Sequence, residues 1–139
     1  MDFRFLEKYQ PQLLAALRIV VGLLFFEHAT QKFFAFPVPF PLPGPLPPLL
    51  IAAGAIELVA GALVTLGLFT RLAAFIASGE MAVAYFMQHF PKGFWPAANG
   101  GEGAILFCFI FLYIASAGPG AWSIDRARHP LGDDGTALR

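Results

Sequence analysis

The sequence has few charged residues and almost no cysteine. Of its 139 residues 13% are charged and 58% are hydrophobic, whereas soluble domains are about 25% charged. A soluble monomer of this length could not cover its surface with so few charges, which excludes an ordinary cytosolic enzyme and a disordered tail. The one cysteine, Cys108, excludes an intramolecular disulfide, a CxxC redox pair and a cysteine-rich metal site. The composition therefore predicts a membrane protein.

Neither sign of charge is in excess. Nine lysines and arginines balance nine aspartates and glutamates, so we expect no nucleic-acid partner. The sequence also lacks the GxGxxG, P-loop, HExxH and GxSxG motifs. No tight spacing of histidine with carboxylates indicates a metal, so we predict no metal site. The partner that the composition implies is the lipid bilayer.

Four long apolar stretches follow one another along the chain. A spanning helix takes about 20 apolar residues, so four passes use most of the chain and leave one domain, residues 1–139. Irregular backbone cannot face lipid, and the alternating pattern of a membrane barrel is missing. We therefore predict an all-α fold, a four-helix transmembrane bundle of up-down-up-down topology. Its helices are expected at residues 13–34, 49–69, 72–90 and 102–118.

The segments between these stretches differ in character. Residues 36–48 contain seven of the twelve prolines and cannot be helical. They are also apolar, so we expect a stiff loop at the bilayer interface, which serves either as a connector or as a cover. A polar tail is predicted at residues 126–139.

The basic residues outside the apolar stretches lie mostly on one side of the predicted bundle. By the positive-inside rule, that side is the cytoplasm, and both termini belong to it. The residues that set this orientation are Arg4, Lys8, Arg71, Arg126 and Arg128.

The position of the remaining charges is the most informative feature. Four of the five glutamates fall inside or at the edge of apolar stretches. A charge near the bilayer centre costs at least about 2.5–3.5 kcal/mol, so these groups are expected to face one another inside the bundle. The predicted ligand pocket or proton path consists of Arg18, His28, Lys32, Glu57, Glu80 and Glu102.

Helix geometry places two of the carboxyls near mid-depth. At a rise of 1.5 Å per residue, Glu57 and Glu80 lie within about 5 Å of the bilayer midplane. Glu57 is flanked by Gly54 and Gly61, and small residues at this spacing let membrane helices approach closely. Both carboxyls are thus expected on packing faces.

A purely structural role for these charges is the alternative. Lys32 would pair with Glu102, and Arg18 with Glu80 or Glu57. Such pairs can fix the register of helices without doing chemistry.

Two histidines, His28 and His89, are the candidate cofactor ligands on the outer side. A bis-histidine haem would need a cavity that 139 residues can barely enclose, which disfavours haem.

A set of residues distributed along the chain carries a family resemblance. The set is Arg18, Gly22, the run His-Ala-Thr-Gln-Lys at 28–32, Glu57, Gly61, Gly67, Arg71, Met81, Gly100-Gly101-Glu102, Gly118, Gly120, Ser123 and Asp125. In this order they resemble the DoxX family of small bacterial membrane proteins over nearly the whole chain. The chain has Ala29 where the family often has glycine.

The resemblance implies a four-helix protein of the bacterial inner membrane. The family is named for a subunit of an archaeal quinol-oxidising or thiosulfate:quinone system, and other members are linked to membrane oxidoreductase complexes. Its pattern points to Arg18, His28, Lys32, Glu57 and Glu102.

The first functional hypothesis is a redox-complex subunit that binds quinone or another small redox molecule. His28 would hydrogen-bond an oxygen of the ligand, and Glu57 and Glu80 would carry protons. Lys32 and Glu102 would control the outer entrance.

Two other functions stay open. One is a non-catalytic interaction or assembly subunit, and the other is a pathway for a small solute or protons. Other membrane or redox-complex subunits, or a second copy of the chain, are the expected protein partners. Because no nucleophile or cofactor fingerprint is present, the chain is at most an oxidoreductase subunit and is not expected to complete a reaction alone.

Overall fold

The computed structural model describes residues 2–129, and all regular structure within them is helical. This confirms the predicted all-α class. The four longest helices are α1 (Gln10–Phe34), α2 (Pro48–Leu66), α3 (Thr70–Ala84) and α5 (Glu102–Ala117). The short elements are the 3₁₀ helices η1 (Arg4–Tyr9) and η3 (Phe90–Lys92), the π-helical turn η2 (Tyr85–His89), α4 (Pro96–Asn99) and α6 (Ile124–Arg128).

Helix boundaries follow local backbone chemistry. α2 ends at Leu66, before the predicted boundary at 69, because Gly67 adopts a left-handed conformation with φ +68°. Its N–H binds the carbonyl groups of Leu63 and Val64, as in a helix C-cap. The predicted helix 72–90 corresponds to α3 continued by η2. Of the predicted tail, residues 130–139 lie outside the described part of the chain, and α6 extends into its beginning.

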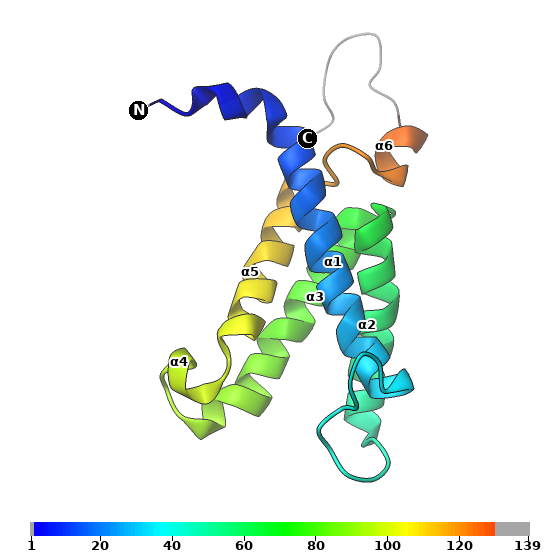
Figure 1. Ribbon diagram of the computed structural model, residues 1–139, viewed down its shortest axis with the longest axis vertical. Coiled ribbons are helices and arrows are strands. Elements are labelled where there is room, and N and C mark those ends of the chain that lie inside the picture. The colour runs from blue at the N-terminus through cyan, green and yellow to red at the C-terminus, as the bar shows by residue number, and fades with distance from the viewer. Residues whose placement is uncertain (1, 130–139) are drawn as a thin grey trace.

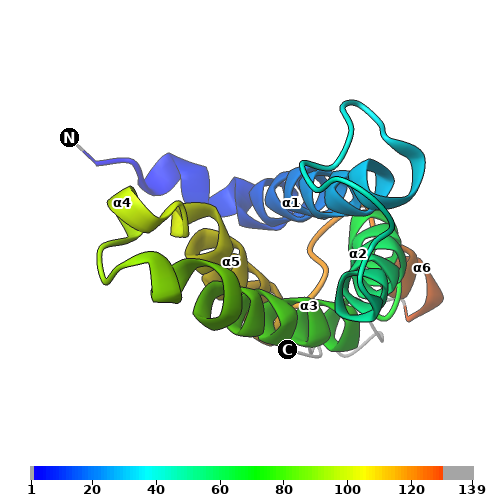
Figure 2. The ribbon, with the colours of Figure 1, turned by 90° about the horizontal axis from the view of Figure 1, so that it is seen from below.

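The four long helices form two pairs, and a contact between α2 and α3 joins the pairs. α1 packs along α2, α3 packs along α5, and α2 also contacts α3. Figures 1 and 2 show the four long helices side by side, with consecutive ones running in opposite directions. α1 and α2 approach closely at Gly61, where an added Cβ would lie 2.9 Å from the backbone nitrogen of Phe26. The expected small-residue packing face of α2 is confirmed.

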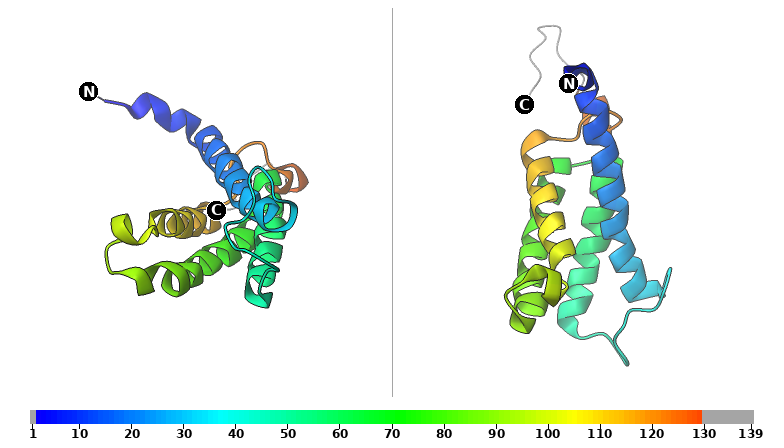
Figure 3. Two further views of the ribbon diagram at one scale, coloured as in Figure 1. Left: turned by 60° about the horizontal axis from the view of Figure 1, so that its bottom comes forward. Right: turned by 60° about the vertical axis from the view of Figure 1, so that its left-hand side comes forward.

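The contact between α1 and α5 is narrower. The Phe25 ring on α1 meets Phe111 on α5 edge-on, with centroids 4.9 Å apart, and lies 6.1 Å from Phe107. Beyond this contact the two helices diverge toward the end of the molecule that carries the Pro-rich loop (Figures 1 and 3). This loop is the segment predicted at residues 36–48, of which Pro48 begins α2. The divergence leaves side chains of α1 without cover from α5.

Arg18 joins two segments at the opposite end of the molecule. It is fully buried, and its guanidinium donates to the carbonyl oxygens of Val64 (3.1 Å), Thr65 (2.9 Å), Ala121 (3.3 Å) and Trp122 (2.9 Å). The last carbonyls of a helix lack partners within the helix and carry partial negative charge. The predicted pairing of Arg18 with Glu80 or Glu57 is therefore wrong, because the end of α2 supplies its acceptors.

Asp125, which is distant in the sequence, binds free backbone N–H groups at the start of α3. Its carboxylate accepts from the backbone N–H groups of Phe69 and Thr70, both at 2.9 Å, and from the Thr70 hydroxyl at 2.7 Å. Partial burial raises the pKa of this carboxyl, but these hydrogen bonds and the charge of Arg128 outweigh it and hold the pKa below its ordinary value. Asp125 thus acts as an N-cap for α3.

The exterior of the long helices is apolar. The segment Arg4–Phe34 and the helix Pro48–Leu66 are each long and apolar enough to cross a membrane, and Glu102–Ala117 is a shorter apolar helix. Large hydrophobic side chains are exposed on each long helix, among them Leu23, Val59, Phe75 and Phe109. Such a surface suits contact with lipid.

Candidate functional site

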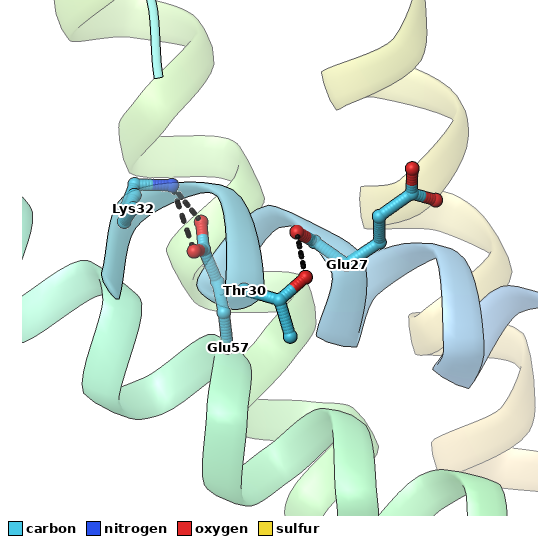
Figure 4. Close-up of polar contacts among 4 residues, drawn as sticks. All are labelled: Glu27, Thr30, Lys32 and Glu57. Atoms are coloured by element: carbon cyan, nitrogen blue, oxygen red, sulfur yellow. Dashed lines mark hydrogen bonds and ion pairs between the residues drawn. The ribbon is translucent and has the colours of Figure 1, made fainter. Parts of the chain in front are cut away.

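A buried ion pair connects α1 and α2. Lys32 Nζ lies 2.9 Å from Glu57 Oε1 and 2.7 Å from Oε2 (Figure 4). Only 6% of the Lys32 side chain and 5% of the Glu57 side chain are exposed. The predicted pairing of Lys32 with Glu102 is wrong, since Glu102 begins α5 as an exposed residue.

Gly54 makes room for this pair. It lies one turn before Glu57 on α2, and a Cβ there would be 3.2 Å from Lys32 Cδ and 2.7 Å from the Phe33 ring. A lysine near a helix end usually extends its ammonium toward water. Here the missing side chain lets Lys32 lie across α2 and reach a carboxylate inside the molecule.

The Pro-rich loop covers the ion pair. The Phe40 ring centroid lies 5.1 Å from Lys32 Nζ, within the range of a cation–π interaction. Between the predicted roles of connector and cover, this contact favours the cover.

Glu80 on α3 is a third buried ionisable group, which interacts electrostatically with this pair. Each of its carboxyl oxygens exposes less than 1 Å² and has no hydrogen-bond partner among the described residues. Glu57 and Lys32 are the charged groups that act on it electrostatically. Lys32, Glu57 and Glu80 are hereafter the buried charge cluster.

A second polar site faces outward between α1 and α5. Here a groove of about 260 Å³ is lined by Leu24, Glu27, His28, Gln31 and Phe107, and it is hereafter the α1–α5 groove. His28 is exposed, and its ring meets Phe107 edge-on with centroids 5.9 Å apart. Figure 4 shows the Glu27 carboxylate directed toward α5, away from the ion pair. The groove thus combines two hydrogen-bonding side chains, a carboxylate and an aromatic ring.

His28 and the buried charge cluster do not share one pocket, contrary to the sequence prediction. His28 lies about 80° around the helix from Arg18. It is exposed at the margin of the buried face, beside Phe107 of α5. Glu27 and Gln31 were not among the predicted site residues. Their spacing from His28, one residue before and three after, is the signal that places all three on the side facing α5.

The other two predicted site residues lie at the α3–α5 connection. His89 Nδ1 is 3.1 Å from the carbonyl oxygen of Asn99, and its ring stacks on Tyr85 at 6.3 Å. Asn99, which the sequence did not indicate, is buried and binds Tyr85, Gly93 and Gly101. The predicted outer entrance of Lys32 and Glu102 is not assembled, because Lys32 binds Glu57 and Glu102 is exposed at the start of α5.

A further groove in the described part of the chain is apolar. An apolar groove of about 340 Å³ lies on the outer side of α2 and α3, between residues 55–63 and 69–76, and is lined only by hydrophobic side chains. Within the described residues, no group of three or more histidine, cysteine, aspartate or glutamate side chains is placed to hold a metal ion.

Comparison with known proteins places the chain in a family. The DoxX family model matches residues 13–90, which is more than half of the chain. The chain belongs to the DoxX family. A protein of Haemophilus influenzae named as uncharacterized is 50% identical over 125 residues, covering 86% of this chain and 93% of that protein. No solved structure matches the chain at a significant level.

A second relative is described as an uncharacterized membrane protein of Mycobacterium tuberculosis. It is 30% identical over 140 residues, which covers 88% of this DoxX protein and 85% of the relative. The segment matched by the family model includes the buried charge cluster and His28, whereas Glu102 and Phe107 lie beyond it.

Proposed function

We propose that this DoxX protein is a multi-pass subunit of a membrane oxidoreductase system and binds a quinone headgroup in the α1–α5 groove. The family is linked to membrane-associated, oxidoreductase-related roles. The observation that carries the proposal is the presence of His28, Gln31 and Phe107 together in a groove on an otherwise apolar exterior.

In this proposal α1, α2, α5 and α3 continued by η2 cross the bacterial inner membrane, with both termini in the cytoplasm. α5 has 16 residues and is about 24 Å long, slightly shorter than a hydrocarbon core of about 30 Å. Its neighbours η2 and α4 extend the apolar layer at that end. The basic residues near the N-terminus and in α6 favour this orientation by the positive-inside rule.

The groove matches the chemistry of a quinone. A quinone ring presents two carbonyl oxygens that accept hydrogen bonds, and His28 and Gln31 supply N–H donors. Phe107 offers an aromatic edge for the ring. A volume of about 260 Å³ suits a headgroup, and in this proposal the isoprenoid tail stays in the lipid.

Photoaffinity labelling tests the proposal. A short-tailed azidoquinone is added to purified protein in lipid nanodiscs, and labelled peptides are mapped by mass spectrometry. We expect labelling on α1 and α5 that unlabelled quinone displaces. His28→Ala removes one hydrogen bond to the ligand, which corresponds to about a five- to tenfold loss of affinity. Gln88→Ala, an exposed polar residue on η2, is the matched control. Labelling that is spread over the exterior and resists competition would argue against the groove.

A non-catalytic assembly subunit is the second candidate, and the hydrogen bonds of Arg18 favour it. This buried charge is taken up by four backbone carbonyl groups, so it serves the fold rather than a ligand. Co-purification with an enzymatic partner, combined with full activity of the complex in His28→Ala, would support this function over quinone binding.

A further inference from the structure

We infer that the buried charge cluster holds one exchangeable proton, shared by Glu80 and Glu57, and forms a proton-transfer site inside the membrane. Lys32 is the fixed positive charge of this site. The inference is independent of the α1–α5 groove and does not require that a quinone binds there.

Charge balance is the first argument. The cluster contains one ammonium and two carboxyl groups, and Lys32 directs two hydrogen bonds to Glu57 alone. With both carboxyls ionised, the cluster would carry one uncompensated negative charge in a region sealed from water. Burial of an unpaired charge is strongly unfavourable, and such a group neutralises instead. One bound proton makes the cluster neutral.

The surroundings of Glu80 identify where this proton rests. Both of its carboxyl oxygens are buried without a donor in the described part of the chain, whereas both oxygens of Glu57 accept from Lys32. An ionised carboxylate needs donors, so Glu57 is the ionised member and Glu80 is the protonated one. Glu80 lines neither of the two grooves described above.

The elements packed around Glu80 bring few other titratable groups. α1 contributes Lys32, and α2 contributes Glu57. α5 contributes the thiol of Cys108, which lies 3.5 Å from the Ser78 hydroxyl of α3. The Pro-rich loop contributes the uncharged ring of Phe40 over Lys32. The charge of the site is therefore set by the three members of the cluster.

Transfer of the proton from Glu80 to Glu57 requires Lys32 to change its partner. When the proton leaves the Glu80 carboxyl and binds a Glu57 oxygen, the Lys32 ammonium moves from Glu57 to the newly ionised Glu80. One O–H bond breaks and one forms, and the total charge stays at zero in both arrangements. A lysine ammonium stands on a flexible four-carbon stem, and in this proposal its change of partner lets one proton pass between α3 and α2 without an unpaired charge.

Infrared spectroscopy counts the protonated carboxyls. Quinone-free protein in a detergent without ester groups is compared with each variant at pH 7, using the carbonyl stretching band of a carboxylic acid and its shift in heavy water. We expect one buried acid in the wild type and none in Glu80→Gln. Glu57→Gln also gives none, because Lys32 then pairs with Glu80. Lys32→Met gives two, since both carboxyls must be neutral.

The double variant Lys32→Met/Glu57→Gln separates this charge count from misfolding. It lacks the ion pair but keeps Glu80, so one acid band is expected, as in the wild type. Glu102→Gln, at an exposed residue, leaves the band unchanged, and circular dichroism establishes that each variant is helical. Absence of a buried acid in the wild type, or its persistence in Glu80→Gln, overturns the inference. Neither result bears on azidoquinone labelling near His28, so the two proposals fail separately.

Discussion

His28 and Lys32 lie one turn apart on α1 but belong to different environments. Lys32 Nζ is 2.7 Å from a carboxylate oxygen of Glu57 inside the molecule, whereas the His28 ring is exposed beside Phe107 in the α1–α5 groove. α1 therefore contributes to two sites: Lys32 belongs to the buried charge cluster, and His28 belongs to the α1–α5 groove. The long side chain of Lys32 and the divergence of α5 produce this separation.

Removal of the ammonium from the ion pair should destabilise the fold. In Lys32→Met, Glu57 loses its buried partner, and loss of one member of a buried pair costs about 3–5 kcal/mol. The melting temperature in detergent should fall clearly. Lys32→Met/Glu57→Gln should recover much of this loss, because position 57 then has no buried carboxyl group that must take up a proton once its ammonium partner is gone. Equal destabilisation in the single and double variants would contradict a pairing of these two groups.

A side chain at Gly54 should displace Lys32. The added Cβ of Gly54→Ala would lie 2.7 Å from the Phe33 ring, and overpacking of this kind costs about 1–3 kcal/mol. Gly79→Ala on α3 is the control, because nothing lies within 4 Å of a Cβ there, and a helical glycine replaced by alanine gains about 0.5–1 kcal/mol. Thermal unfolding of the two variants should change in opposite directions. A stabilised Gly54→Ala would show that Lys32 does not need this space.

The connection from α5 to α6 should depend on Arg18. In Arg18→Lys the ammonium cannot reproduce the planar fork that spans four carbonyl groups, and each lost hydrogen bond to a charged group is worth about 1.5–3 kcal/mol. Limited proteolysis should then cut within residues 118–128 faster than in the wild type. Arg126→Lys, at an exposed residue of α6, should leave the cleavage rate unchanged. Unaltered cleavage in Arg18→Lys would argue that the segment is held by other contacts.

Asp125 should make stability depend on pH at acid values. Its pKa is lower in the folded protein than in the unfolded chain, so its contribution is complete above the unfolded pKa and disappears as pH falls through the folded pKa. At neutral pH, Asp125→Asn should be less stable by about 1 kcal/mol, as for loss of a helix N-cap. Melting curves of wild type and variant should converge as the pH falls below the ordinary pKa of an aspartate and through the lower folded pKa, whereas a gap independent of pH would exclude the charge as the cause.

Local patterns were sufficient for much of the fold. The lengths of the apolar stretches predicted α1, α2 and α5 closely, because each stretch ends where proline or glycine interrupts the helix. The small residues around Glu57 predicted the face on which α1 packs. The end of α2 was missed by three residues. Gly67 ends the helix in a left-handed conformation, at a point where an added Cβ would collide with Arg18 and Ser123, and both of these residues are distant in the sequence.

The partners of the charged residues were predicted poorly. Depth alone placed Lys32 beside Glu102, but the absent side chain of Gly54 and the cover provided by Phe40 directed it to Glu57. Arg18 was expected to pair with a carboxylate, but it donates hydrogen bonds to carbonyl groups at the end of α2 and at residues 121–122. The depth of a residue is its position along one helix. Whether two side chains on different helices form an ion pair depends also on the rotation and tilt of both helices.

The sequence by itself determined that this chain forms apolar helices with a few ionisable groups among them, since hydrophobicity and proline positions act locally. Only the tertiary structure decided that Lys32, Glu57 and Glu80 lie together while His28 faces outward. α5 contacts α1 where Phe25 meets Phe111 and diverges from it beyond that contact (Figure 1), and His28 is exposed there. Contacts between residues so distant along the chain leave no periodic signal within either segment.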